Sequence, residues 1–61
     1  MTIIIFYKNG KADARIVSDV FVGDRSVVFN AGENQAFGAC YDLDNIKKIV
    51  VDGVTIWEAD E

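Results

Sequence analysis

The chain has 61 residues, a mass of 6.7 kDa and a hydrophobic content of 51%. Its net charge of -4 and pI near 4.5 argue against nucleic-acid binding, because phosphates attract a basic surface and the six basic residues here are scattered. A chain of this length is predicted to form one domain, spanning residues 1–61.

A subunit this small has little interior, so the hydrophobic gain on folding only about balances the entropy lost. Small domains regain stability through disulfides, metal ions or association. The single cysteine, Cys40, cannot form an internal disulfide, and the lack of histidine argues against a zinc site. We therefore expect a homo-oligomer, with a dimer favoured.

Residues 2–7 form an apolar run that ends at the turn pair Asn9-Gly10, which is typical of a two-residue type I′ hairpin loop. Apolar residues at both parities indicate a strand covered on both faces. The predicted register has a core face that pairs Tyr7 with Ala12, Ile5 with Ala14 and Ile3 with Ile16. On its mixed outer face it pairs Phe6 with Asp13, Ile4 with Arg15 and Thr2 with Val17.

The next stretch, residues 11–22, is predicted to be one long strand that bends near Ser18-Asp19. Its core parity comprises Ala12, Ala14, Ile16, Ser18, Val20 and Val22. A four-residue loop at residues 23–26 then pairs Val22 with Val27 and Val20 with Phe29. Phe21 and Val28 consequently face outward.

Residues 30–34 have the composition of a loop, and residues 35–41 read as a strand of small residues in which Gly38 marks a bulge or a close backbone approach. Within this strand Cys40 is expected to be a buried structural thiol. Asp42 is expected to cap one helical turn that places Leu43 and Ile46 in the core.

The closing segment is predicted to be a hairpin around the two-residue turn Asp52-Gly53. Its inner face pairs Val51 with Val54 and Ile49 with Ile56, with Lys47 and Glu58 at the rim. Its outer face pairs Val50 with Thr55 and Lys48 with Trp57. The sequence thus predicts an all-β fold, a small antiparallel meander barrel or roll of five to six strands with one helical turn near residues 42–46.

Catalytic chemistry is not expected from this composition. Without histidine there is no Ser-His-Asp or Cys-His arrangement, and Ser18 and Ser26 are read as turn or bend residues. The acidic stretch Asp42-Leu43-Asp44-Asn45 lacks the glycine and distal glutamate of a calcium loop, and no phosphate-binding motif is present. We therefore expect no enzyme activity, no metal and no cofactor.

Outward apolar side chains are the strongest functional signal, because aromatic anchors usually carry interface energy. The predicted partner or self-association face comprises Trp57, Phe6, Ile4, Val50, Phe21 and Val28. The alternative is that sheet curvature places some of these side chains inside. A possible acidic contact surface comprises Asp42, Asp44, Asp52, Glu58 and Asp60, which all fall in the closing third of the chain.

The first residues lack the features of a signal peptide, and no apolar stretch approaches membrane-spanning length. Together with the lone thiol, this favours a reducing cytoplasm. The expected partner is a protein, with neither nucleic acid nor membrane bound directly.

Three stretches of the chain resemble a known class of small proteins. They are Ile3-Ile4-Ile5-Phe6-Tyr7-Lys8-Asn9-Gly10, Val22-Gly23-Asp24, and Tyr41-Asp42-Leu43-Asp44-Asn45-Ile46 followed by Ile49-Val50-Val51-Asp52-Gly53. In them the chain resembles the small uncharacterised β proteins that phages and prophages encode in tightly packed gene clusters. The resemblance implies an accessory role without catalytic residues. Some acidic proteins of this kind resemble inhibitors of host defence nucleases, which imitate nucleic-acid charge or block a surface.

The first hypothesis is therefore a non-enzymatic phage-type accessory protein that binds a host or phage protein, such as a host defence protein that it inhibits. A second hypothesis is a structural or assembly component of the virion. A third is an oligomer that sequesters a small molecule between its subunits. In an infected host the first of these would act in the host cytoplasm.

Overall fold

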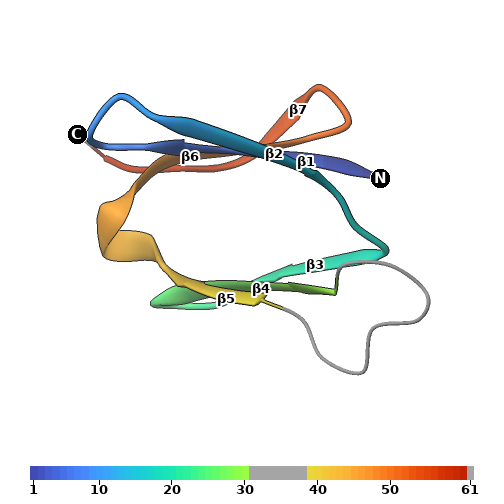
Figure 1. Cartoon of the computed structure of the whole chain (residues 1–61). Coiled ribbons are helices and arrows are strands. Elements are labelled where there is room, and N and C mark those ends of the chain that lie inside the picture. The colour runs from blue at the N-terminus through green and yellow to red at the C-terminus, as the bar shows by residue number, and fades with distance from the viewer. Residues whose placement is uncertain (31–38, 61) are drawn as a thin grey trace.

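The computed structural model describes residues 1–30 and 39–60, which form seven β-strands and one 3-10 helical turn (Figure 1). The strands are β1 (Thr2–Tyr7), β2 (Ala12–Ile16), β3 (Asp19–Val22), β4 (Ser26–Asn30), β5 (Ala39–Asp42), β6 (Ile46–Val51) and β7 (Val54–Glu58). The helical turn η1 (Leu43–Asn45) joins β5 to β6. The predicted all-β fold with a helical turn near residues 42–46 is confirmed.

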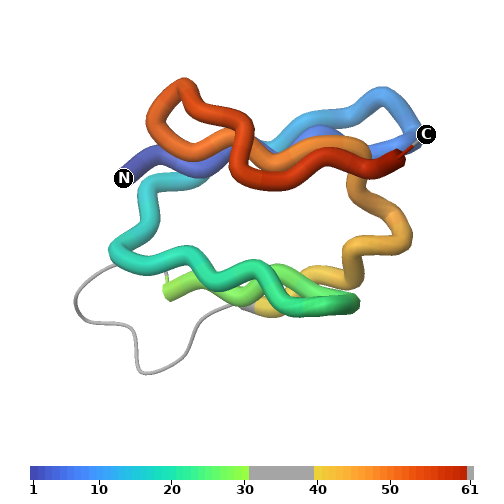
Figure 2. The backbone as a smooth tube through the Cα atoms, turned by 180° about the vertical axis from the view of Figure 1, so that it is seen from behind, coloured from blue at the N-terminus to red at the C-terminus, as the bar shows by residue number. Residues whose placement is uncertain are grey.

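The strands form two antiparallel sheets that lie in two layers (Figures 1 and 2). The large sheet has the order β2-β1-β6-β7, and the small sheet has the order β3-β4-β5. The chain changes layer between β2 and β3 and again through η1 (Figure 1). Seven strands are found in the described residues instead of five to six, because residues 11–22 form two strands in different sheets.

The first hairpin has a register one residue away from the predicted one. The observed pairs are Thr2–Ile16, Ile3–Arg15, Ile4–Ala14, Ile5–Asp13 and Phe6–Ala12. The Tyr7 N–H donates to the Lys11 carbonyl at 2.8 Å and closes a three-residue loop. A two-residue type I′ loop needs positive φ at both Asn9 and Gly10, and only Gly10 has it, at 92°.

This one-residue difference exchanges the two faces of β2. Ala12, Ala14 and Ile16, predicted to face the core, are exposed, whereas Asp13 and Arg15 share a face with the buried Ile3 and Ile5. Arg15 Nε and Asp13 Oδ2 lie 3.3 Å apart in an ion pair at the edge of the sheet. Inward-pointing charges on an edge strand discourage pairing with another edge.

The predicted bend near Ser18-Asp19 is where the chain passes from one sheet to the other. Val17 is buried there, and its N–H donates to the Met1 carbonyl at 2.8 Å. The Ser18 N–H donates to the carbonyl of Asn30 at 2.9 Å in the small sheet. Two exposed residues therefore separate Val17 from Val20, the next side chain packed on the core.

The second hairpin follows its prediction. Val22 lies opposite Val27 and Val20 opposite Phe29, with the Gly23 N–H bonded to the Ser26 carbonyl at 2.8 Å. The predicted loop at residues 30–34 begins within β4, which extends to Asn30. The structure does not describe the rest of this loop. The first part of the predicted strand at 35–41, with Gly38, also lies outside the described residues.

Helical turn η1 is built as its sequence predicts. The Asp44 N–H donates to Asp42 Oδ1 at 3.1 Å, so Asp42 caps the turn. Leu43 and Ile46 are both buried.

The closing hairpin has the predicted turn but an extra residue in β7. Asp52 and Gly53 have φ values of 49° and 83°, as a type I′ turn requires, and Val51 lies opposite Val54. Beyond Val50–Thr55 the register shifts to Ile49–Trp57 and Lys48–Glu58. The predicted pairs Ile49–Ile56, Lys47–Glu58 and Lys48–Trp57 are therefore wrong, because a β-bulge inserts Ile56.

The core lies between the two sheets. Its buried side chains are Ile3, Ile5, Ile46 and Ile49 of the large sheet, Val27 and Phe29 of the small sheet, and Val17 and Leu43 at the connections. No polar side chain is buried among residues 1–30 and 39–60. One face of each sheet is thus committed to the core.

Candidate interaction surfaces

The large sheet has an outer face that points away from the small sheet. We define this outer face by the register pairs that alternate with the buried ones: Thr2, Ile4, Phe6, Ala12, Ala14, Ile16, Lys48, Val50, Thr55 and Glu58. Six of these ten side chains are apolar. Ile4, Phe6 and Val50 are half-buried by their neighbours in the sheet, and Ile16 at the edge is 79% exposed.

The centre of the outer face is apolar because β1 and β6 carry hydrophobic residues at both parities. Ile4 lies between Ala14 of β2 and Val50 of β6. The run at residues 2–7 was predicted to be covered on both faces. In the described structure the core covers only the face that carries Ile3 and Ile5, and Ile4 and Phe6 lie on the open face.

Charge on the outer face is balanced. The Lys48 Nζ lies 5.1 Å from the centre of the Phe6 ring, in a cation–π contact, and Lys48 pairs across the sheet with Glu58. The two charges cancel, although the whole chain carries -4. The outer face is therefore a neutral, mostly apolar surface.

The small sheet has an outer side of its own, on which Phe21, Val28 and Cys40 lie in one row across β3, β4 and β5. Phe21 is 71% exposed and Val28 is 40% exposed. Cys40 is also exposed, so its predicted burial is wrong. Its side chain follows the outward parity of Val28, whereas Tyr41 next to it points inward and packs on the core.

The six residues predicted as a partner face therefore lie in three places. Ile4, Phe6 and Val50 lie together on the outer face of the large sheet, whereas Phe21 and Val28 lie on the opposite side of the molecule. Trp57 lies on neither side, because the bulge in β7 turns its side chain to the core face opposite Ile49. The alternative of an inward position thus holds for Trp57.

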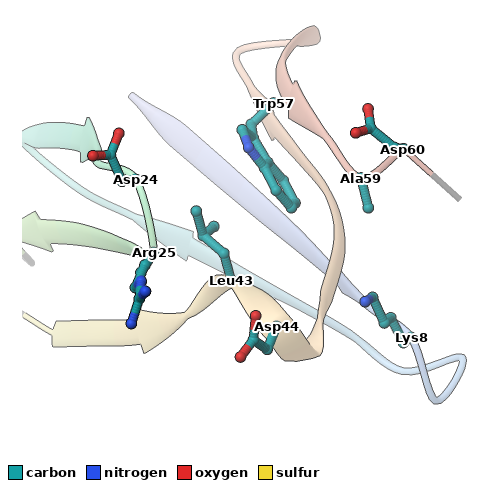
Figure 3. A pocket seen from close by; sticks show the side chains of 8 residues that line it. All are labelled: Lys8, Asp24, Arg25, Leu43, Asp44, Trp57, Ala59 and Asp60. Carbon is teal, nitrogen blue, oxygen red and sulfur yellow. The ribbon is translucent and has the colours of Figure 1, made fainter.

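Trp57 instead lines a hollow at the end of the molecule that carries η1, which we call the end cavity (Figure 3). The end cavity has a volume of about 610 Å³ and is lined by Lys8, Asp24, Arg25, Leu43, Asp44, Trp57, Ala59 and Asp60. Figure 3 shows Trp57 and Leu43 near its middle, with charged side chains around them. These residues come from both sheets, so periodicity within one strand does not predict the cavity.

Three backbone hydrogen bonds fix the walls of the end cavity. The Leu43 N–H donates to the Arg25 carbonyl at 2.9 Å, and the Lys8 N–H donates to the Asn45 carbonyl at 3.0 Å. The Ala59 N–H donates to the Lys47 carbonyl at 2.8 Å and holds the end of the chain against β6. The hollow is thus a defined part of the fold.

The predicted acidic residues do not form one surface. Asp44 and Asp60 line the end cavity, and Asp42 caps η1. Asp52 accepts a hydrogen bond from the Thr2 N–H at 2.8 Å at the opposite end of the large sheet, and Glu58 belongs to its outer face. A charge pattern that imitates nucleic acid would need these carboxylates on one side.

An aromatic row connects the two layers. The ring of Tyr7 in β1 lies 6.4 Å from that of Tyr41 in β5, and Tyr41 meets Phe29 edge-on at 5.5 Å. Burial raises the pKa of the Tyr7 hydroxyl, Tyr41 and Asp13 raise it further, and Arg15 lowers it. The row packs the sheets together, and the Tyr7 hydroxyl stays protonated near neutral pH.

Other kinds of site find little support in the described residues. No group of three or more His, Cys, Asp or Glu side chains is placed there to hold a metal ion. A second hollow of about 420 Å³ brings Cys40 near Arg25, Ser26, Asp42 and Asp44, and it is more open and smaller than the end cavity. No helix in residues 1–30 and 39–60 is long and apolar enough to cross a membrane.

Comparison of the chain with protein-family models, with curated proteins and with solved structures finds no match.

Proposed function

We propose that this chain is a non-enzymatic protein-binding module that uses the outer face of the large sheet. The observation that carries the proposal is that Ile4, Phe6 and Val50 lie side by side on an open sheet, with the exposed Ala12, Ala14 and Ile16 beside them. Apolar surface of this kind is stabilised when another apolar surface removes it from water.

The size of the outer face supports a binding role. Four strands about 4.8 Å apart and about 18 Å long present an area of about 350 Å² in plan. The largest apolar patch on a monomeric protein is typically about 300–600 Å² and is often functional. The whole outer face, its four polar side chains included, falls at the lower end of that range, whereas a single exposed hydrophobic residue would need no explanation.

The chemistry of the face specifies the kind of partner. A neutral, mostly apolar sheet face suits the apolar surface of another protein, such as a second β-sheet, which packs face to face at about 10 Å. A strongly basic or acidic partner would find little complementary charge there, since Lys48 and Glu58 cancel. The end cavity, with its mixed charges, lies at a different place on the molecule.

An accessory role of the phage type agrees with this proposal, because such a protein acts by covering a surface of a host or phage protein. The inhibition of a host defence protein in the cytoplasm is the specific form that we propose. Of the two mechanisms considered for such inhibitors, surface blocking is favoured over charge imitation, because Asp42, Asp52 and Glu58 lie on separate parts of the fold.

The proposal is tested by affinity capture from host lysate with three immobilised baits: the natural chain, Ala14→Glu and Phe21→Glu. Ala14 is exposed on the edge strand β2, directly beside Ile4 of the outer face, so a carboxylate there opposes apolar contact while the monomer keeps its core. Phe21→Glu makes the same kind of change on the small sheet. We expect proteins that the natural chain and Phe21→Glu retain and that Ala14→Glu loses. Equal capture by all three baits, or capture by none, would contradict the proposal.

A further inference from the structure

The outer face of the large sheet has the properties of a surface that pairs with itself. It is mostly apolar, and its two charges, Lys48 and Glu58, cancel and lie on neighbouring strands. In a two-fold dimer the same patch meets itself, so a neutral patch with one charge of each sign avoids like-charge repulsion. By the register of the small sheet, its outer side carries Asp19 and Asp42, so a two-fold pairing there would bring a net negative surface against itself.

Small residues along β2 allow close approach. Ala12 and Ala14 are exposed and have only a methyl side chain, so another sheet can pack against Ile4 and Phe6 without obstruction from β2. The edge of β2 is less suited to pairing, because Asp13 and Arg15 point inward beside it. At the other edge the β-bulge of β7 interrupts the strand. Face-to-face packing is therefore favoured over the extension of the sheet by edge pairing.

We infer that a second copy of this chain covers the outer face, in a weak two-fold dimer with stacked large sheets. This inference rests on the proposed function and names the occupant of the same surface. The dimer has four sheet layers, with the small sheets outermost. A target protein with a better-fitting surface would displace the second copy.

The area of the interface sets the strength of the dimer. Each copy contributes about 350 Å² in plan, which places the dimer among the small interfaces, below about 1,200 Å² in total, that hold transient complexes. We expect a dissociation constant between about 1 µM and 1 mM, so that a tighter partner competes successfully.

The experiment is sedimentation equilibrium of the purified chain from about 10 µM to 1 mM, within the expected range of dissociation constants. The average mass should rise from that of one chain, 6.7 kDa, toward twice that value. Ala14→Glu should raise the dissociation constant at least about tenfold, because like charges meet and are desolvated. Phe21→Glu should leave it unchanged. Circular dichroism checks that each variant is folded, and Val50→Thr, which keeps the shape of the side chain, replaces Ala14→Glu if that variant unfolds.

Sedimentation and lysate capture together test the dimer and the proposed function independently. A chain that stays monomeric at about 1 mM while Ala14-dependent capture of another protein persists overturns the inference and leaves the function standing. A monomer that captures nothing overturns both. A dimer that Phe21→Glu weakens and Ala14→Glu does not would place the interface on the small sheet and overturn the inference.

Discussion

At the scale of single residues, Gly10 is the position where backbone conformation matters most clearly. Its φ of 92° lies in the left-handed region, and a β-carbon there would meet no atom within 4 Å, so conformational strain is the only cost. Gly10→Ala should lower the free energy of unfolding by about 1 kcal/mol. Gly23→Ala is the matched control, because the added carbon would lie at an ordinary 3.5 Å from the Ser26 carbonyl oxygen. Urea unfolding measures both, and an equal loss in the two variants would contradict the reading of the loop.

Titration of Tyr7 makes the free energy of unfolding depend on pH in the alkaline range. Because its pKa is raised in the folded state, the unfolded chain loses this proton first as the pH increases. The contribution of Tyr7 is complete below the ordinary tyrosine pKa of about 10 and is lost as the pH rises through the folded value. The free energy of unfolding should therefore fall above about pH 10, and Tyr7→Phe should reduce that fall.

The measurement is urea unfolding of the natural chain and Tyr7→Phe between about pH 8 and pH 11. Absorbance of the phenolate follows the titration in the folded state, and Tyr41→Phe should bring the pKa of Tyr7 closer to its ordinary value. A folded Tyr7 that titrates below the ordinary value would be incompatible with its half-buried place beside Tyr41.

At the scale of elements, η1 joins the small sheet to the large one, and the side chain of Asp42 caps this turn. Asp42→Ala removes the acceptor for the Asp44 N–H and should cost about 0.5–2 kcal/mol of stability. Asp42→Asn keeps an oxygen in the same place and should cost less. Thermal or urea unfolding of both variants checks the cap. A loss as large in the asparagine variant would show that the charge of Asp42, and not its hydrogen bond, is what matters.

Turn chemistry explains which strand pairs could be predicted from the sequence. Asp52-Gly53 and the loop at residues 23–26 gave the right pairs next to each turn. Asn9-Gly10 did not, since glycine with positive φ serves a three-residue loop as well as a two-residue one. The sequence of residues 2–7 does not distinguish a two-residue loop from a three-residue loop. Its apolar residues stand at both parities, so isoleucine side chains are buried in either register.

The prediction for Trp57 failed for a related reason. One inserted residue, Ile56, reverses parity for everything beyond it in β7, and a bulge of this kind leaves no clear sequence signal. The positions of Ile4, Phe6 and Val50 on one open face follow the prediction, because alternation along β1 and β6 places them on the side opposite the buried Ile3, Ile5 and Ile49. The end cavity was missed, since it depends on how η1 meets the loops of both sheets.

At the scale of the whole molecule, two sheets of a 61-residue chain share one thin core, and each sheet leaves its other side open. The large sheet has the wider open side and the more apolar centre. A second copy stacked on that side would give β1 and β6 the two covered faces that their sequences indicate. The same contact would make folding more stable as protein concentration rises.

The most direct test detects contacts between two copies by nuclear magnetic resonance. A mixture of isotope-labelled and unlabelled chains at about 1 mM allows nuclear Overhauser effects between copies to be separated from those within one copy. The dimer predicts such effects from the methyl groups of Ile4, Ala14 and Val50, and none from Val27 in the core. Contacts between copies that arise from Val28 on the small sheet, or no contacts between copies at all, would contradict the account.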